Sequence, residues 1–305
     1  MTTSLSNKTT LLVDGGLGRL ICAIPALEKF IEVNSDSLIV SYFWTPILFG
    51  NKKIHHNIFD NNYKNLYTII KDTKIVRPEP YYNSEYLNGK ISLSDAFNQE
   101  INGSTEKMPV PKIFLSSKEK MLGKTFRQQN KKMIAFQPFG SSANFSNQEC
   151  IDQTARSMNI PTAQSIVKRL KEEGYNIFLI TDKLVSEYFS ATDFVSTQSF
   201  QPRDLAAIIS NCDYYLGIDS AGQHIARCFD VPGTVLIGGT NARNISYPEW
   251  FNIYDVDPNK KYMPYRLCEF DSYIAELENS DLLNFNRIQA DTFIENAISH
   301  LKSTI

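Results

Sequence analysis

Short apolar runs alternate with longer segments of helical periodicity along both halves of the chain. Runs of about four to eight apolar residues are typical of buried strands, and apolar residues at every third or fourth position are typical of helices. In the first half the runs are TTLLVD, SLIVSYFW, NLYTII and TKIVRP, and a helix is expected over about 17–33. This alternation predicts a parallel sheet with crossover helices.

The second half repeats the pattern from MIAFQPFG to GTVLIGG, with NIFLITD and DYYLGID as further strands. One of its helices is expected to begin at Pro161 and end at Gly174, because proline suits the first turn of a helix and glycine its end. Strand and helix succeed each other without interruption, which predicts a doubly wound α/β domain.

Residues 78–112 interrupt the alternation, since they are rich in Tyr, Asn and Pro and poorly periodic. They predict a loop with short helices over a ligand site. A chain of 305 residues fits two domains. We therefore expect an N-terminal domain over 1–125, a C-terminal domain over 126–285, and a last helix over 286–305 that packs back on the N-terminal domain.

Composition makes the chain an ordinary globular protein, with 42% hydrophobic and 21% charged residues. The net charge of −2 gives no overall positive field for nucleic acid or anionic membranes, so any such contact is local. The N-terminus lacks a signal-peptide pattern, and no apolar run reaches the ~18 residues that span a bilayer. The cysteines form no CxxC pair and predict buried thiols in a reducing, cytoplasmic compartment: Cys22, Cys150, Cys212, Cys228 and Cys268.

The first candidate site is the loop DGGLGR, which follows the first strand. Its glycines Gly15, Gly16 and Gly18 allow close approach of a ligand to the backbone, or they merely close a turn. Arg19 lies in the first turn of the expected helix, where the helix dipole disfavours a cation. We therefore expect Arg19 to face an anion.

Three loops of the second half have the composition of phosphate-binding loops, although surface loops can share it. The first follows MIAFQ and offers two hydroxyls, Ser141 and Ser142. Another ends the strand GTVLI and offers Gly239 and Thr240. Ligands of open α/β sheets bind at the carboxyl ends of strands, which favours a binding role for both.

The third of these loops, DSAGQH, carries the strongest signal. Asp219 and Ser220 are expected to cap a helix by accepting hydrogen bonds from its first-turn amides. Gly222 and His224 follow in that first turn, so an anion there would meet amides, a hydroxyl and an imidazole. A structural histidine is the plainer alternative.

Other common chemistries lack their patterns. No His, Cys, Asp or Glu cluster has metal-ligand spacing, so no metal site is predicted. There is no GxSxG nucleophile motif and no paired-carboxylate signature.

Together the last two loops, LGIDSAGQHIARCFDVPGTVLIGGTNARN, resemble the C-terminal signature of glycosyltransferase family 9, the heptosyltransferase family. The match is carried by the Asp219–Gly222 segment, His224, Val231-Pro232 and Gly238–Thr240. In the first loop Gly18 and the later Pro-Ala-Leu are similar to the family as well. The resemblance covers roughly residues 11–30 and 133–248.

This resemblance implies the GT-B fold, with two doubly wound Rossmann-like domains facing a central cleft. The second domain would hold a nucleoside diphosphate sugar and the first an acceptor, with inversion at the anomeric carbon and no catalytic metal or cofactor. The implied donor-binding residues are Ser141, Ser142, Asp219, Ser220, Gly222, His224, Gly239 and Thr240.

Two positions depart from the family. Arg19 stands where the family usually has an aspartate that acts as general base, and an arginine does not take up a proton at neutral pH. Asp14 is then the nearest candidate base, followed by a carboxylate within residues 78–112. Arg19 is expected to belong to the catalytic site as an anion-binding residue. The family's lysine that neutralises the donor phosphate is also missing, and Arg156 is its expected substitute.

The predicted function is therefore an inverting, metal-independent transfer of a hexosyl, pentosyl or heptosyl group to a saccharide or glycolipid. One alternative is a DNA glycosyltransferase acting on a hydroxymethylated base, as in bacteriophages, since lysines, Arg77 and tyrosines between positions 52 and 82 would suit DNA. A solvated charged face with core aromatic residues is the plainer interpretation of the same residues. Others are a nucleotide-sugar epimerase and a non-catalytic nucleotide-sugar binder. The sequence indicates no oligomeric state.

Overall fold

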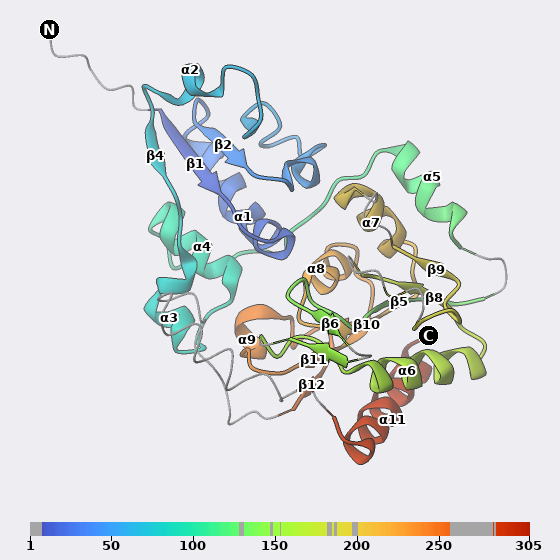
Figure 1. Cartoon of the computed structure of the whole chain (residues 1–305). Coiled ribbons are helices and arrows are strands. Elements are labelled where there is room, and N and C mark those ends of the chain that lie inside the picture. Colours follow the sequence, from blue (N-terminus) through green and yellow to red (C-terminus); the bar gives the residue numbers. More distant parts are fainter. Residues whose placement is uncertain are drawn as a thin grey trace, which may run out of the picture. The chain divides into compact units, whose positions relative to one another are not determined.

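The chain forms two compact units, residues Met1–Ser116 and Ser117–Ile305 (Figure 1). This computed structural model describes residues 8–127, 131–146, 149–152, 154–181, 185, 188–196, 201–256, 283 and 285–305. Both units are built on parallel sheets flanked by helices, as the alternating pattern predicts.

The first unit has a four-stranded parallel sheet in the order β3-β2-β1-β4. The strands are β1 (Thr9–Val13), β2 (Leu38–Ser41), β3 (Ile58–Asp60) and β4 (Lys74–Val76). The expected first helix is confirmed as α1 (Leu17–Val33). Its buried side fills the core together with α4 (Leu93–Asn102), which begins with a capping box between Ser92 and Asp95.

The segment NLYTII is not a strand, contrary to its apolar pattern. It forms the short helix α2 (Leu66–Ile70), in which no residue is buried. A run this short fits either a strand or a helix turn, and its neighbours decide between them. Other short elements are η1 (Thr45–Leu48), η2 (Pro80–Tyr82) and α3 (Ser84–Leu87), the last two within the predicted loop-and-helix excursion.

The second unit has a six-stranded parallel sheet in the order β12-β11-β10-β5-β8-β9. The chain starts at β5 in the middle, adds β8 and β9 on one side, then returns to add β10, β11 and β12 on the other. This strand order is that of a Rossmann-type sheet. All its strands are parallel, and the side on which successive strands are added switches between β5 and β10. The strands are β5 (Met133–Gln137), β8 (Asn176–Leu179), β9 (Phe194–Val195), β10 (Tyr214–Ile218), β11 (Gly233–Ile237) and β12 (Asn252–Asp255).

Helices and one hairpin complete this unit. The antiparallel hairpin of β6 (Asn144–Ser146) and β7 (Glu149–Ile151) follows β5. The predicted helix near Pro161 is confirmed as α6 (Ile160–Glu172), with the Asn159 side chain accepting from the Thr162 amide at 3.0 Å. The remaining helices are α5 (Ser117–Thr125), α7 (Pro202–Ile209), α8 (Ala221–Cys228), α9 (Ala242–Ile245) and α11 (Arg287–Thr304).

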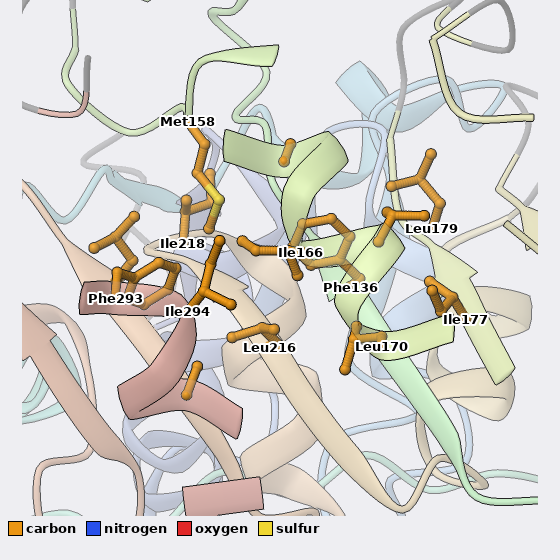
Figure 2. Close-up of a cluster of buried hydrophobic side chains, with 14 of the residues drawn as sticks. Phe136, Met158, Ile166, Leu170, Ile177, Leu179, Leu216, Ile218, Phe293 and Ile294 are labelled. Atoms are coloured by element: carbon orange, nitrogen blue, oxygen red, sulfur yellow. The ribbon is translucent and has the colours of Figure 1, made fainter. Parts of the chain in front are cut away.

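The last helix, α11, packs its apolar side into the core of the second unit. Figure 2 shows Phe293 and Ile294 of α11 among side chains of α6 and of strands β5, β8 and β10. The sequence-based hypothesis was that this helix packs back on the N-terminal domain, whereas α11 belongs to the second compact unit. Its buried residues are Ala290, Phe293, Ile294, Ala297, Ile298 and Leu301.

Helix α5 also belongs to the second unit, so the structure divides the chain after Ser116 rather than after residue 125. Its Gly123 lies so close to α7 that a Cβ there would be 2.1 Å from the Ala207 carbonyl oxygen. Arg203 of α7 also forms an ion pair with Glu119 of α5. The helix before β5 thus packs against α7 of the second unit.

Candidate functional site

The carboxyl ends of β5 and β10 lie side by side at the point where the strand order of the second sheet switches sides. Gln137 forms the central hydrogen bonds at this point. Its Oε1 accepts from the Gly222 amide at 3.0 Å and from the Tyr215 hydroxyl at 3.1 Å. Its Nε2 donates to Ser220 Oγ at 3.0 Å. Gln137 therefore joins the end of one strand to the first turn of α8.

The predicted side-chain cap of α8 is wrong. Ser220 is the N-cap residue, but its side chain accepts no hydrogen bond from the helix amides. The Gly222 amide is instead satisfied by Gln137, from another strand. Glycine is favoured here because a Cβ at Gly222 would lie 2.3 Å from Gln137 Oε1, and the Gln137 side chain would have to shift. The glycine thus permits close packing of the helix on the strand end.

Asp219 is buried just beneath this turn, with 4% of its surface exposed. Its Oδ1 accepts from Gln223 Nε2 and its Oδ2 from Thr240 Oγ1, each at 2.9 Å. Burial raises the pKa of Asp219, while the Arg156 guanidinium and the two hydrogen bonds lower it. Three sequence-predicted residues, Arg156, Asp219 and Thr240, are therefore brought together.

His224 is also buried, with 3% exposed, and its Nδ1 lies 3.0 Å from the hydroxyl of Tyr247. Burial lowers its pKa to about 4. The imidazole is therefore neutral at pH 7 and offers a neutral polar group, not a cation. Sequence reasoning missed Tyr247, which stands 23 residues later and is placed only by the fold.

The loop after β5 is arranged around Asp152, a buried carboxylate that sequence reasoning missed. Asp152 Oδ1 accepts from Ser142 Oγ at 2.9 Å and from Thr154 Oγ1 at 2.6 Å. The Thr154 amide donates to the same oxygen at 2.9 Å, an Asx turn that the Asp-x-Thr pattern could have indicated. Arg156 Nε donates to Thr154 Oγ1 at 3.1 Å. Ser141, in contrast, is exposed.

The loop after β11 packs against this arrangement. Gly238 faces the carbonyl of Ala155, which would lie 2.3 Å from a Cβ on the glycine. Ala155 itself has a positive φ of 50°, unusual for a residue with a side chain. Gly239 is buried next to Thr240. The loops after β5, β10 and β11 thus form one connected site in the second unit.

In the first unit Arg19 has negative partners within the protein. Its side chain is 5% exposed, and its Nη1 lies 3.3 Å from a Glu79 carboxylate oxygen. Its Nη2 donates to the Pro78 carbonyl at 2.7 Å and lies 3.9 Å from Asp14 Oδ1. These groups offset the unfavourable position of a cation in the first turn of α1.

Asp14 is held by a second arginine. Arg77 Nη2 lies 2.7 Å from Asp14 Oδ2, and Arg77 Nε lies 3.4 Å from Glu79. We call Asp14, Arg19, Arg77 and Glu79 the first-loop charge cluster. It lies at the carboxyl ends of the adjacent strands β1 and β4. The sequence pattern placed Arg77 among basic residues that would suit DNA and Glu79 within the range 78–112, but it did not predict that they pair with Asp14 and Arg19.

The glycines of the first loop differ in their roles. Gly15 has a φ of 95°, and a Cβ there would lie 2.9 Å from Arg19 Cδ. Gly16 is the N-cap of α1, and a Cβ added to it would meet no atom within 4 Å, while Gly18 lies in the first turn. The indole of Trp44 donates to the Gly15 carbonyl at 3.1 Å, a contact with no sequence signal.

The described residues also bear on metal binding, membrane spanning and the state of the cysteines. No three His, Cys, Asp or Glu side chains among them are grouped to hold a metal ion. The described helices include none that is long and apolar enough to cross a membrane. Cys22, Cys150, Cys212 and Cys228 are thiols, of which Cys22 and Cys212 are buried, and Cys268 lies outside the described residues.

No protein-family model matches the sequence, and no curated protein matches it. The fold, in contrast, has clear relatives among solved structures. A glycosyl transferase of family 9 from Veillonella parvula DSM 2008 aligns over 99% of both chains, with a TM-score of 0.67 and 13% identity.

Two further structures align over most of the chain. The iron-containing heptosyltransferase TibC from enterotoxigenic E. coli, in complex with ADP-D-beta-D-heptose, matches 97% of this chain and 78% of its own, with a TM-score of 0.60 and 12% identity. The E. coli ADP-heptose lps heptosyltransferase II matches 90% of this chain and 98% of its own, with a TM-score of 0.50 and 12% identity. The chain therefore has the GT-B fold of these enzymes.

Proposed function

We propose that this chain is a glycosyltransferase that moves a sugar from a nucleoside diphosphate sugar to an acceptor hydroxyl. The observation that carries the proposal is the connected site at the carboxyl ends of β5, β10 and β11, where Thr240 donates to the buried Asp219, Arg156 interacts with its charge, and Gln137 holds Ser220. A sheet of this order binds nucleotides at that edge. The likeness to heptosyltransferase structures, one of them with bound ADP-heptose, supports this assignment.

The proposed reaction is a single displacement with inversion. The acceptor oxygen attacks the anomeric carbon, its proton passes to a base, and the nucleoside diphosphate leaves with the electron pair of the broken bond. Asp14 is the proposed base because its carboxylate is 39% exposed at the end of β1. A saccharide or glycolipid is the proposed acceptor class.

We further propose that the donor diphosphate needs no metal ion. The Arg156 guanidinium and the N-terminal end of α8 would stabilise the charge of the leaving group. Activity that survives EDTA would support this, and activity restored only by added divalent ions would contradict it.

The test of the proposed function is incubation of the purified chain with labelled ADP-, UDP-, GDP- and CDP-sugars, with and without saccharide acceptors. Nucleoside diphosphate released only in the presence of an acceptor supports transfer. Conversion of the sugar without an acceptor would indicate an epimerase instead. Binding without turnover for every acceptor would indicate a nucleotide-sugar binder.

A further inference from the structure

The hydroxyl groups beside Asp152 have little capacity to bind a phosphate. Asp152 is 4% exposed and accepts hydrogen bonds from the hydroxyls of Ser142, Thr154 and Ser157. Each hydroxyl has one hydrogen to donate, and a phosphate oxygen accepts hydrogen bonds. While Asp152 is ionised, these three hydrogens are directed into the loop, and only oxygen lone pairs remain.

The free lone pairs of these hydroxyl oxygens can accept hydrogen bonds from a cation, and Arg156 is a cation that donates to one of them. Its Nε donates to Thr154 Oγ1 at 3.1 Å, while Thr154 in turn donates to Asp152 at 2.6 Å. The guanidinium also interacts with the buried carboxylate of Asp219. Arg156 is therefore oriented by its hydrogen bond to Thr154, and the charge of its guanidinium is favoured by the carboxylate of Asp219. A guanidinium fixed in this way can recognise a phosphate group with defined geometry.

We infer that Asp152 and Thr154 are positioning residues that orient Arg156 toward the diphosphate of the donor, and that Ser142 and Thr154 do not themselves donate to phosphate. This inference rests on the proposed function and changes the role expected for Ser142, which the sequence resemblance makes a donor-binding residue. The chain from carboxylate to hydroxyl to guanidinium replaces a direct hydroxyl–phosphate contact.

The test is a double-substitution cycle read out by binding of inorganic pyrophosphate and of ADP, UDP and GDP to the full chain. Arg156→Gln should weaken binding of the preferred diphosphate about tenfold or more. Thr154→Val should weaken it several-fold, because the guanidinium loses its acceptor, and Thr154→Ser should restore it. In the Arg156→Gln background Thr154→Val should have little further effect, since Thr154 acts through Arg156.

Controls separate positioning from folding. Thr292→Val makes the same change at an exposed threonine of α11, whose hydroxyl bonds the Ile288 carbonyl, and should leave binding unchanged. Thermal unfolding of each variant reports whether the loop change lowers stability. A merely structural Thr154 would lower the melting temperature and weaken binding equally in both backgrounds.

The outcomes distinguish this inference from the proposed function. If the unsubstituted chain binds a diphosphate and the two substitutions act additively, the positioning role is wrong while the proposed function stands. If Ser142→Ala weakens binding as much as Arg156→Gln, the hydroxyl contacts the phosphate directly and the inference is also wrong. If the unsubstituted chain binds no diphosphate, both proposals fall.

Discussion

The carboxyl edges of the two sheets hold charge in different ways. In the first-loop charge cluster two arginines and two carboxylates neutralise one another, and Arg77 and Asp14 remain 60% and 39% exposed. In the second unit the carboxylates of Asp152 and Asp219 are 4% exposed and are held mainly by hydroxyls and amides. Water reaches and solvates the partly exposed charges of the first-loop charge cluster, whereas buried carboxylates held mainly by neutral donors fix the shape of a loop.

The difference suggests a division of roles. Proton transfer requires a group that reaches both its substrate and solvent, which favours the first edge. Binding a fixed diphosphate requires groups that do not move, which favours the second edge. Substitutions at both edges can therefore separate a loss of turnover from a loss of binding or stability.

The largest effect is expected for Asp14→Asn, which removes the proposed base. Turnover should fall by about 10² or more while donor affinity changes little, because the amide does not accept the proton. Steady-state kinetics and donor binding provide the measurement. Glu79→Gln, at the other carboxylate of the first-loop charge cluster, is the matched control and should retain turnover within about tenfold. Equal losses in both variants would mean that the cluster acts only by its charge.

The second prediction concerns pH and His224. Because burial lowers its pKa from 6.5 to about 4, the unfolded chain binds a proton between these values that the folded chain does not. The contribution of His224 to the free energy of unfolding is therefore complete above pH 6.5 and falls as the pH drops toward 4. The total loss is up to about 3 kcal/mol. Denaturant unfolding at pH 7 and 4.5 measures this loss, and His224→Gln should reduce it.

His300 contributes in the same direction, since burial lowers its pKa as well, and His300→Gln isolates its share. His55→Gln, at an exposed histidine of the first unit, is the negative control. If His224→Gln left the acid sensitivity unchanged, the neutral state of this imidazole would be the wrong assignment.

The third prediction compares the two arginines of the first-loop charge cluster. Arg19→Met should lower the free energy of unfolding by about 2 kcal/mol, because Glu79 and the buried Pro78 carbonyl lose a buried donor, while the 29% exposure of the Glu79 side chain limits the penalty. Arg77→Met should cost at most about 1 kcal/mol, since Arg77 is 60% exposed. Chemical denaturation of both variants measures the two losses in the free energy of unfolding. Equal costs would show that burial does not distinguish the pair.

The smallest expected effect is a difference in stability between two glycine-to-alanine variants, one at each sheet edge. Gly222→Ala should destabilise the protein by roughly 1–2 kcal/mol, because its Cβ would approach Gln137 Oε1 to 2.3 Å. Gly16→Ala should change stability by less than about 0.5 kcal/mol, as no atom lies within 4 Å of the new carbon. The melting temperatures of the two variants give the comparison, and a larger shift for Gly16→Ala would reverse it.

The sequence predicted much of the fold because the long elements depend on local patterns. Helix α1 and the strands that end just before Asp14 and Asp219 follow from periodicity and turn residues. The residues 66–70 were misjudged because five apolar-rich positions without burial carry no reliable period. The packing of α11 depends on contacts with α6 and the second sheet, which no local pattern encodes.

The candidate site was predicted less completely, for a physical reason. The sequence identified Arg156, Asp219 and Thr240, which lie close to strand ends and which the structure brings together. It missed Gln137 as an organising residue and Asp152 as the centre of its loop. Their partners are up to 85 residues away or lie beyond the β6–β7 hairpin, so only the folded sheet unites them.

The position of α11 has a consequence for biosynthesis. The first unit contains every element of its own core within residues 1–116, so it can fold as soon as that stretch has left the ribosome. The second sheet keeps an apolar surface open until residues 287–304 have emerged and covered it. Nascent chains caught before that point expose this surface to chaperones and to each other, and the second unit is where aggregation during translation would begin.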